Sequence, residues 1–311
     1  MLDTTMGIGM LSNAGKSRLM EKIAAYITLV QRQRVVIIVN EMTLSALKKC
    51  LITTVLNNPE FQALHGVNIT KPEKELTDGV YRDNNGDIIY REKDENGQPV
   101  ETTDEFIERL KATSDEYNKV MQVADWIDSE TQELMYCIDV GDDFDDSRLE
   151  FEIRNAHFKN GINYWFYDTF QADLHSNGDW ASIKTTAMKL EHLSKELNMF
   201  GFMTFQLTDD TEYVKPDELT SNNIASCKHI KHGLWTMGML KEIPPGDFHK
   251  YGYYQSKSDW GEGIICDLKE NCRYFVFNTE KNRFGDKKKI LIEVNLDLNT
   301  WLEKGVLAKK I

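Results

Sequence analysis

Apolar runs alternate with helical periodicity in the first 60 residues of the chain. Met6–Met10 is a short apolar run, and Arg34–Asn40 is an unbroken β-branched run, typical of a strand that is buried on both faces. Between them, Gly15–Val30 repeats its apolar residues every three to four positions, as an amphipathic helix does. Thr43–Leu56 is again helical, with Thr43 or Ser45 as its N-cap. The pattern predicts the order strand, loop, helix, strand, helix.

The same alternation returns in the second half of the chain. It predicts strands at Leu134–Val140, Gly161–Tyr167, Gly201–Leu207, Arg273–Asn278 and Lys289–Asn295, with one more starting within Met237–Lys241, and helices at Asp146–Lys159 and Trp180–Asn198. We expect Arg273–Asn278 and Lys289–Asn295 to be the last strands. Strands that alternate with helices predict an α/β fold with a mainly parallel central sheet that is flanked by helices.

A polar segment separates the two halves. The turn signals Asn84–Asp87 and Glu95–Gly97 predict a small β-hairpin or meander, and Thr103–Trp126 has a charged helical pattern. We therefore expect a core of residues 1–58 and 127–311, interrupted by a mixed β/α insertion of residues 59–126.

Composition narrows the class of protein. The 311 residues are 41% hydrophobic with a net charge of −13, so a sizeable core is expected, and nucleic-acid binding would need a local basic patch. No run of about 18 apolar residues predicts a membrane span, and the first residues do not read as a secretory signal. The five cysteines lack a CxxC, which suits a cytoplasmic protein. Cys227, His229 and His232 are close in sequence, but their spacing fits no usual zinc pattern.

The segment Met10–Ser17 carries the first candidate chemistry. It reads M-L-S-N-A-G-K-S and matches the phosphate-binding pattern G-x-x-x-x-G-K-[ST], except that Met10 replaces the first glycine. Its amides and the positive end of the next helix would hold the phosphates of ATP. Lys16 would reach the β- and γ-phosphates, and Ser17 would ligate Mg²⁺. The residues expected to bind nucleotide are Ser12, Asn13, Ala14, Gly15, Lys16, Ser17 and Arg18.

Three polar residues at predicted strand ends would complete such a site. Asp168 follows Tyr164–Tyr167, and at the carboxyl edge of the sheet it would hold the Mg²⁺. Glu41 follows the strand that ends at Asn40 and would polarise the attacking water. Gln206 would contact the γ-phosphate or that water. Each residue alone is ordinary, so the hypothesis depends on all three sharing one edge with the phosphate loop.

Two cations near the C-terminus are a further candidate. Lys281 and Arg283 precede Phe284–Gly285, and an arginine that enters a neighbouring site stabilises charge on a phosphoryl group in transfer. The competing interpretation is a solvated turn, because lysines 287–289 follow directly.

The order of these segments resembles the RecA-like ATPase domain of DnaB-type replicative helicases. The resemblance covers residues 6–58 and 130–300 and is carried by Glu41-Met42, by Asp168 with Gln171, by the segment Leu190–Phe205 and by K-N-R at residues 281–283. It implies catalytic roles for Lys16, Glu41 and Gln206, with Lys281 and Arg283 acting on the nucleotide of an adjacent subunit. The implied ligands and partners are ATP, Mg²⁺, single-stranded DNA, further copies of the chain in a hexameric ring, and a primase or loader protein.

The chain also departs from that family. The insertion has no recognised counterpart, Leu207–Asp210 replace the usual residues after the sensor glutamine, and the domain that precedes the ATPase domain in the family is not in this sequence. These features suggest a phage or mobile-element replication protein. Candidate DNA contacts are the loop of residues 172–179 with His175, and Thr211–Lys231 with Lys215, Lys228 and Lys231.

Three functions stay open on the sequence. The first is a ring-forming helicase motor, which DNA-stimulated and salt-sensitive ATP hydrolysis would indicate. The second is a RecA-like loader or recombination factor that hydrolyses ATP without separating strands. The third is a nucleotide-binding interaction module whose acidic insertion recruits a partner.

Overall fold

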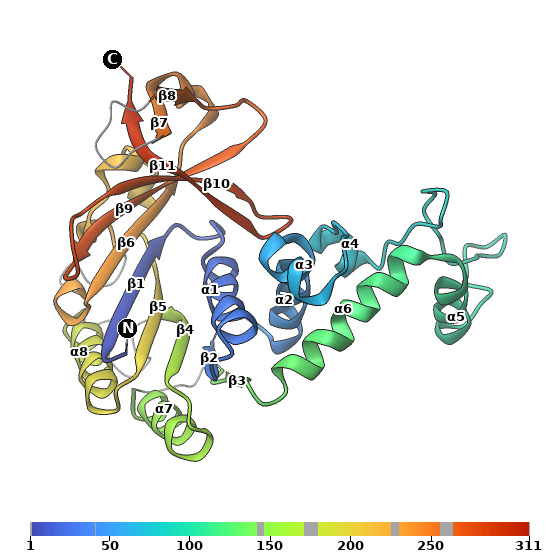
Figure 1. The fold of residues 1–311 in the computed structure, drawn as a ribbon, viewed down its shortest axis with the longest axis horizontal. Helices are drawn as coiled ribbons and strands as arrows, with labels where there is room; N and C mark the ends of the chain where they lie inside the picture. The colour runs from blue at the N-terminus through green and yellow to red at the C-terminus, as the bar shows by residue number, and fades with distance from the viewer. Residues whose placement is uncertain are drawn as a thin grey trace.

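The fold is built on one mixed sheet of eleven strands, seen at the left of Figure 1. The computed structural model describes residues 2–40, 42–141, 146–170, 180–224, 230–255 and 264–310. The parallel part of the sheet is, in spatial order, β3 (Met135–Asp139), β2 (Val35–Val39), β4 (Tyr164–Phe170), β5 (Phe200–Gln206), β1 (Thr4–Met10) and β6 (Thr236–Glu242).

The sheet continues beyond β6 with antiparallel strands. In spatial order these are β9 (Arg273–Asn282), β10 (Lys289–Asn295), β11 (Thr300–Lys309), β7 (Tyr251–Gln255) and β8 (Ile264–Asp267). The prediction of a mainly parallel sheet was wrong, because β9, β10 and β11 follow one another through short turns, and such connections join antiparallel strands. The prediction that Lys289–Asn295 is the last strand was also wrong, since β11 follows it.

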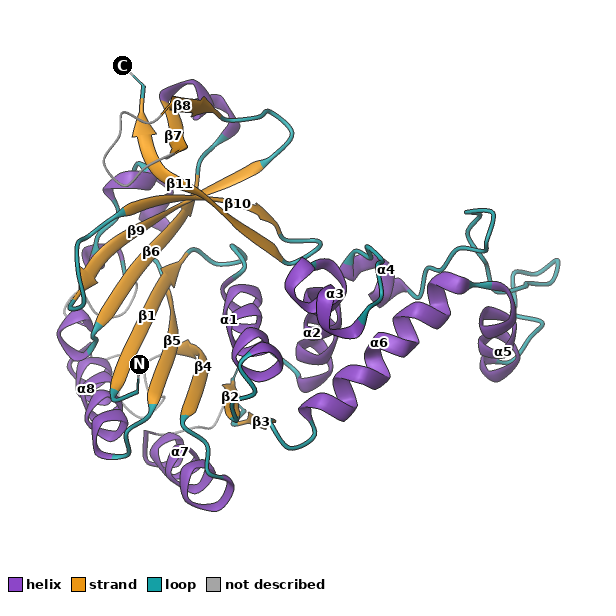
Figure 2. Cartoon of the chain, in the orientation of Figure 1, coloured by secondary structure: helices purple, strands orange, loops and turns teal. Residues whose placement is uncertain are grey.

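Helices cover both faces of the parallel half (Figure 2). Val36 and Ile38 of β2 share a core with Leu149 and Leu193, whereas Val35, Ile37 and Val39 face a second core around Met20. The helices are α1 (Lys16–Ala25), α2 (Leu44–Asn57), α3 (Pro59–His65), α4 (Glu73–Asp78), α5 (Thr103–Thr113), α6 (Asp115–Thr131), α7 (Asp146–Asn160) and α8 (Trp180–Glu196). The β-branched run thus forms a strand that is buried on both faces, as predicted.

Local sequence explains where α2 begins. Thr43 caps α2, and its hydroxyl accepts from the amide of Ala46 at 3.2 Å. Helix α1 continues as a π-helical turn over Tyr26–Val30. Short 3₁₀ turns occupy Asp209–Tyr213, Pro216–Glu218, Ser221–Asn223, Ile230–Gly233 and Pro245–Lys250.

The segment between α2 and β3 projects away from the sheet as an arm that carries α5 (Figure 1). Helix α6 lies along α2 and shares a core with it through Val123 and Leu51. The predicted helix Thr103–Trp126 is two helices, because the Ser114 hydroxyl caps α6 by accepting from Tyr117 N at 3.0 Å. The expected hairpin pairing is reduced to single bridges, Arg82↔Ile88 and Lys93↔Pro99. Among the helices of the described ranges, none has the length and apolar character needed to cross a membrane.

Candidate functional site

The loop between β1 and α1 turns without a glycine at its first position. Met10 is the last residue of β1, its side chain is fully buried, and its carbonyl accepts from Leu207 N at 2.9 Å. The left-handed conformations occur later, at Asn13 (φ 55°) and Gly15 (φ 95°). Asparagine and glycine tolerate that region better than other residues do. Methionine at position 10 is therefore compatible with the bend, because Met10 itself stays in extended strand geometry.

The first turn of α1 has no side-chain cap, and Gly15 precedes the helix. The amides of a first helical turn have no partner within the helix and attract anions. The Lys16 residue is only 8% exposed, and its ammonium group makes no hydrogen bond or ion pair with any residue that the structure describes. A cation without a protein partner beside the free amides of a first helical turn suits an anionic ligand.

The tip of the β10–β11 hairpin lies against this loop. A Cβ atom at Gly15 would come within 2.7 Å of Leu296 Cδ2 and 3.3 Å of Trp301 Cζ2. Asn299, at the tip, donates to the carbonyl of Arg18 at 2.9 Å and to the hydroxyl of Thr54 at 2.6 Å. The hairpin therefore packs directly on the start of α1.

Replacing Gly15 should expose this constraint. Gly15→Ala places a side chain in left-handed backbone against Leu296, which costs about 1–2 kcal/mol for the conformation and about 1–3 kcal/mol for the overlap. We expect a lower free energy of unfolding in urea and weaker nucleotide binding. Gly246→Ala is the control, because its Cβ would have no heavy atom within 4 Å and its backbone needs no positive φ. Equal effects of the two substitutions would contradict this assignment.

Arg18 connects three segments at the same point. Its Nη1 atom donates to Leu296 O at 2.9 Å and pairs with Glu73 Oε2 of α4 at 2.5 Å. The amide of Glu73 donates to Asp297 O at 2.9 Å. The guanidinium of Arg18 thus joins α1, the hairpin tip and the segment after α2, so a direct nucleotide contact would come from its backbone amide.

Asp168 is a buried carboxylate two residues before the end of β4. Its side chain is fully buried, and Oδ1 accepts from Thr204 Oγ1 at 2.6 Å and from Thr169 Oγ1 at 3.0 Å. Its other oxygen, Oδ2, is buried and has no hydrogen-bond partner among the described residues. Asn40, directly after β2, binds the backbone of Thr169, the residue that follows Asp168. Its Oδ1 atom accepts from Thr169 N at 2.8 Å, and its Nδ2 atom donates to Thr169 O at 2.9 Å. The unpartnered oxygen is the kind of group that a hydrated cation satisfies.

Strand register brings the candidate residues to one edge. Met10, which leads into the loop, is level with Gln206 on β5, and Val39 of β2 is level with Asp168 of β4. Neighbouring parallel strands lie about 4.8 Å apart, so the ends of β1, β5 and β4 lie side by side at one edge of the sheet. Gln206 is half-buried at this edge. Glu41 and Gln171 lie outside the described residues, although Asn40, the neighbour of Glu41, ends at this edge.

The chemistry of this edge fits a magnesium nucleotide. An uncapped helix start and the unpaired Lys16 suit phosphate oxygens, and the Asp168 carboxylate with the Ser17 hydroxyl suits the oxygen ligands of Mg²⁺. Sequence reasoning did not include Thr204 or Asn40. Thr204 had a signal, because it is the hydroxyl residue within the apolar run Phe200–Phe205 and precedes Gln206 by two positions.

Lys281 and Arg283 lie at the opposite edge. Asn282 of β9 is level with Thr236 of β6, which is level with Met6 near the start of β1. Four residues of strand, about 13 Å, separate that level from Met10. Arg283 lies over the Trp235 ring at 4.9 Å and pairs with Glu191 at 3.6 Å. Neither cation is brought to the phosphate loop of its own chain.

The other residues that the sequence suggested for DNA or metal binding either form ion pairs or lie outside the described residues. Lys215 pairs with Glu218 at 3.2 Å, and Lys231 pairs with Glu280 at 2.8 Å. His175, Lys228, Cys227 and His229 lie outside the described residues. Within the described ranges, no three His, Cys, Asp or Glu side chains are grouped so that they could hold a metal ion.

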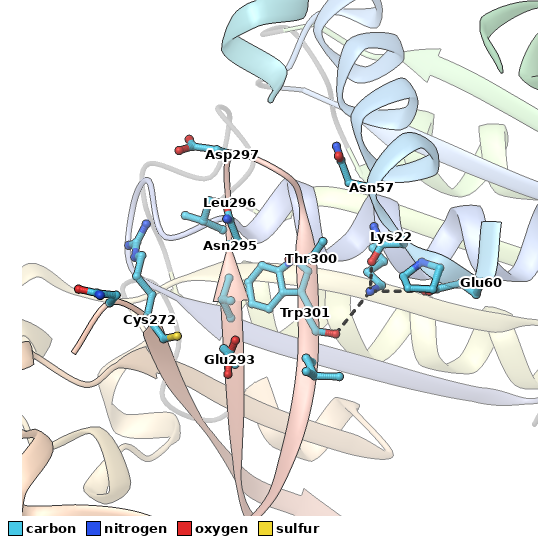
Figure 3. A pocket seen from close by; sticks show the side chains of 16 residues that line it. Lys22, Asn57, Glu60, Cys272, Glu293, Asn295, Leu296, Asp297, Thr300 and Trp301 are labelled. Atoms are coloured by element: carbon cyan, nitrogen blue, oxygen red, sulfur yellow. Dashed lines mark hydrogen bonds and ion pairs between the residues drawn. The ribbon is translucent and has the colours of Figure 1, made fainter. Parts of the chain in front are cut away.

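A cavity of about 760 Å³ borders the site without containing it (Figure 3). Its walls include Trp301 and Leu296 from the hairpin, and Lys22 and Glu60 from α1 and α3. Lys22 Nζ donates to Asn58 Oδ1 at 2.5 Å and pairs with Glu60 at 3.5 Å. Trp301 and Leu296 also cover Gly15, so the hairpin forms a wall shared by the cavity and the loop.

The fold is that of DnaB-like helicase ATPase domains. A solved structure of one such isolated ATPase domain matches 97% of this chain and 85% of its own, with a TM-score of 0.63 and 12% sequence identity. A DnaB-like replicative helicase, solved in work on its interactions with primase, matches with the same TM-score and identity, and this chain spans 59% of that longer one. No family model matches the chain, and no curated protein matches it in sequence. The resemblance predicted from the motifs is thus confirmed for the fold.

Proposed function

We propose that the chain is an ATP-hydrolysing motor domain that acts in a ring on single-stranded DNA, as a DnaB-type replicative helicase does. One observation carries the proposal. Asp168 has a buried carboxylate oxygen without a partner among the described residues, and Lys16 has no ion-pair partner among them. Lys16 starts α1 directly after the loop that follows β1, and Asp168 lies near the end of β4, so both are at one edge of the parallel strands. This is the charge arrangement that a magnesium nucleotide would neutralise.

The roles follow from position. The amides of Ser12–Arg18 and the Lys16 ammonium group would hold the phosphates in the RecA-like manner. Bound Mg²⁺, held by Ser17 and Asp168, would neutralise charge on the phosphates. Glu41 would accept a proton from the attacking water, and Gln206 would orient that water or the γ-phosphate. Lys281 and Arg283, at the far edge of the sheet, would serve the adjacent subunit of a hexamer.

The distribution of charge is compatible with DNA binding. Residues 59–126 contain 16 acidic and 8 basic residues, so they hold 8 of the 13 net negative charges. They form the arm that projects from the sheet (Figure 2). The remaining chain has a net charge of −5, and a local cationic surface within a ring would suffice for backbone contacts. The arm is suited to a protein partner such as a primase or a loader, in the cytoplasm of a bacterial or phage-infected cell.

ATP hydrolysis with and without single-stranded DNA tests the proposal, together with the particle mass. We expect a ring whose hydrolysis rate rises with DNA and falls as salt increases. A monomer whose hydrolysis ignores DNA would contradict the motor. Hydrolysis without strand separation would favour the loader or recombination factor.

Lys16→Ala should abolish this activity at the binding step. Removing a buried charge that holds a charged ligand costs about 2–5 kcal/mol of binding free energy, which is more than about thirtyfold in affinity. Nucleotide affinity by fluorescence titration gives the measurement. Lys48→Ala on α2 is the control, because its side chain is 54% exposed in a surface ion pair with Asp128. Unchanged affinity in Lys16→Ala would leave the interaction module as the better explanation.

A further inference from the structure

We propose that Thr204 is the residue that positions Asp168 for Mg²⁺. The inference rests on the proposed function, because it assigns a role within the proposed magnesium site. Thr204 lies on β5, the strand between the phosphate-loop strand β1 and the Asp168 strand β4. Its side chain is 1% exposed, and its hydroxyl donates to Asp168 Oδ1 at 2.6 Å. This distance is typical of a strong hydrogen bond from a hydroxyl to a carboxylate.

The two oxygens of Asp168 have different surroundings. Oδ1 accepts from two hydroxyls, those of Thr204 and Thr169, whereas Oδ2 is buried and has no partner in the described part of the chain. Because Oδ1 is held by the neighbouring strand and by the next residue, rotation of the carboxylate is restricted. Oδ2 is thereby kept available in a fixed direction. At metal sites, hydrogen bonds from residues that do not bind the metal orient the carboxylate ligands in this way.

The hydroxyl is placed where the strand otherwise needs only apolar packing. Its neighbours Met203 and Phe205 are buried in the core that α7 and α8 cover. A buried hydroxyl is costly unless it is hydrogen-bonded, so the Thr204–Asp168 contact accounts for a polar residue at this point. Residues two apart in a strand face the same side, which puts Thr204 and Gln206 on one face of β5. The strand therefore presents a donor to Asp168 and, one step nearer the edge, the amide assigned to the γ-phosphate.

The test is a Mg²⁺ titration of nucleotide binding on the full chain. A fluorescent ATP analogue is titrated in EDTA and then at increasing Mg²⁺, for wild type, Thr204→Val and Thr204→Ser. We expect Thr204→Val to need about tenfold more Mg²⁺ for the same gain in affinity, with unchanged affinity in EDTA. Thr204→Ser keeps the donor and should behave as wild type. Thr204→Ala serves as a second variant without the donor, should Thr204→Val fail to fold.

The outcomes distinguish the role of Thr204 from the proposed nucleotide-binding function. If Thr204→Val or Thr204→Ala matches wild type in its Mg²⁺ requirement, the positioning role is wrong while the nucleotide site stands. If the affinity in EDTA falls as far as the affinity in Mg²⁺, Thr204 acts through general packing and the inference is also overturned. If wild type binds no nucleotide in either condition, the proposed function fails first, and the inference fails with it.

Discussion

Rings of the Arg283→Ala variant should hydrolyse ATP at least about a thousandfold more slowly than wild-type rings, while their affinity for nucleotide stays nearly the same. An arginine supplied to a transferring phosphoryl group accelerates hydrolysis by about 10³–10⁵. Arg283 is at the sheet edge opposite to the phosphate loop of its own chain. Its contacts with Trp235 and Glu191 fix the position of the side chain. Because the side chain is 39% exposed, it is accessible to a neighbouring subunit.

Mixing variants determines which chain supplies the arginine. Lys16→Ala and Arg283→Ala should each be inactive alone. When the two are mixed, an intact loop in the Arg283→Ala subunit meets an intact arginine from the Lys16→Ala subunit, so activity returns at those interfaces. If the mixture stays inactive although both variants form rings, Arg283 does not act in trans.

The control for Arg283 lies on the same strand. Arg273, at the start of β9, pairs with Glu242 through two bonds of 2.9 and 2.6 Å and sits at the other end of the strand. Arg273→Ala should leave hydrolysis within about twofold, because Arg273 is not at the edge assigned to the adjacent subunit and the loss of its surface ion pair costs at most about 1 kcal/mol of stability. Arg283→Lys keeps the charge without the planar fork and should recover only part of the rate.

The parallel half of the fold could be predicted from local patterns. The strand β2 is a continuous apolar run, and β1, β4 and β5 are mostly apolar. The helices α1, α2 and α8 have clear periodicity, so the local sequence indicates which segments are buried. The proposed site follows from the same pattern, because residues that directly follow parallel strands share one edge. The positions of strand ends and the phosphate motif were sufficient to predict that Lys16, Asp168 and Gln206 share this edge.

The antiparallel half lacked such signals. Strand β11 contains polar residues, a glycine with φ of 137° and several exposed side chains, so its burial depends on partners far away in sequence. The packing of Leu296 and Trp301 on Gly15 joins distant ends of the chain and leaves no mark in either local sequence. Similarly, the Thr204–Asp168 bond depends on the pairing of β4 with β5. Such contacts require the three-dimensional arrangement of the sheet.

Lys71→Met should be the most damaging single substitution in the arm. The Lys71 side chain is fully buried, and its ammonium group donates to Val80 O at 2.5 Å, to Glu75 at 2.9 Å and to Glu116 at 3.0 Å. Breaking a buried ion pair on one side costs about 3–5 kcal/mol, and we expect about 3 kcal/mol, since Arg82 still pairs with both carboxylates. The loss should appear as faster hydrogen exchange in α4 and α6, whereas Lys111→Met, in an exposed pair with Glu108, should change exchange little.

The same network predicts how the arm responds to acid. Hydrogen bonds from Arg82, and then from Lys71, lower the pKa of Glu75 to about 2, against an ordinary value of 4.5. A carboxylate with a lowered pKa stabilises the folded state above its unfolded pKa and loses that effect as the pH falls toward its folded pKa. Protection of α4 and α6 should therefore be complete above pH 4.5 and decline between pH 4.5 and about 2. Because Arg82 is the larger cause, Lys71→Met should lower protection at every pH yet keep most of this decline, and a flat profile in the variant would assign the pKa shift to Lys71 instead.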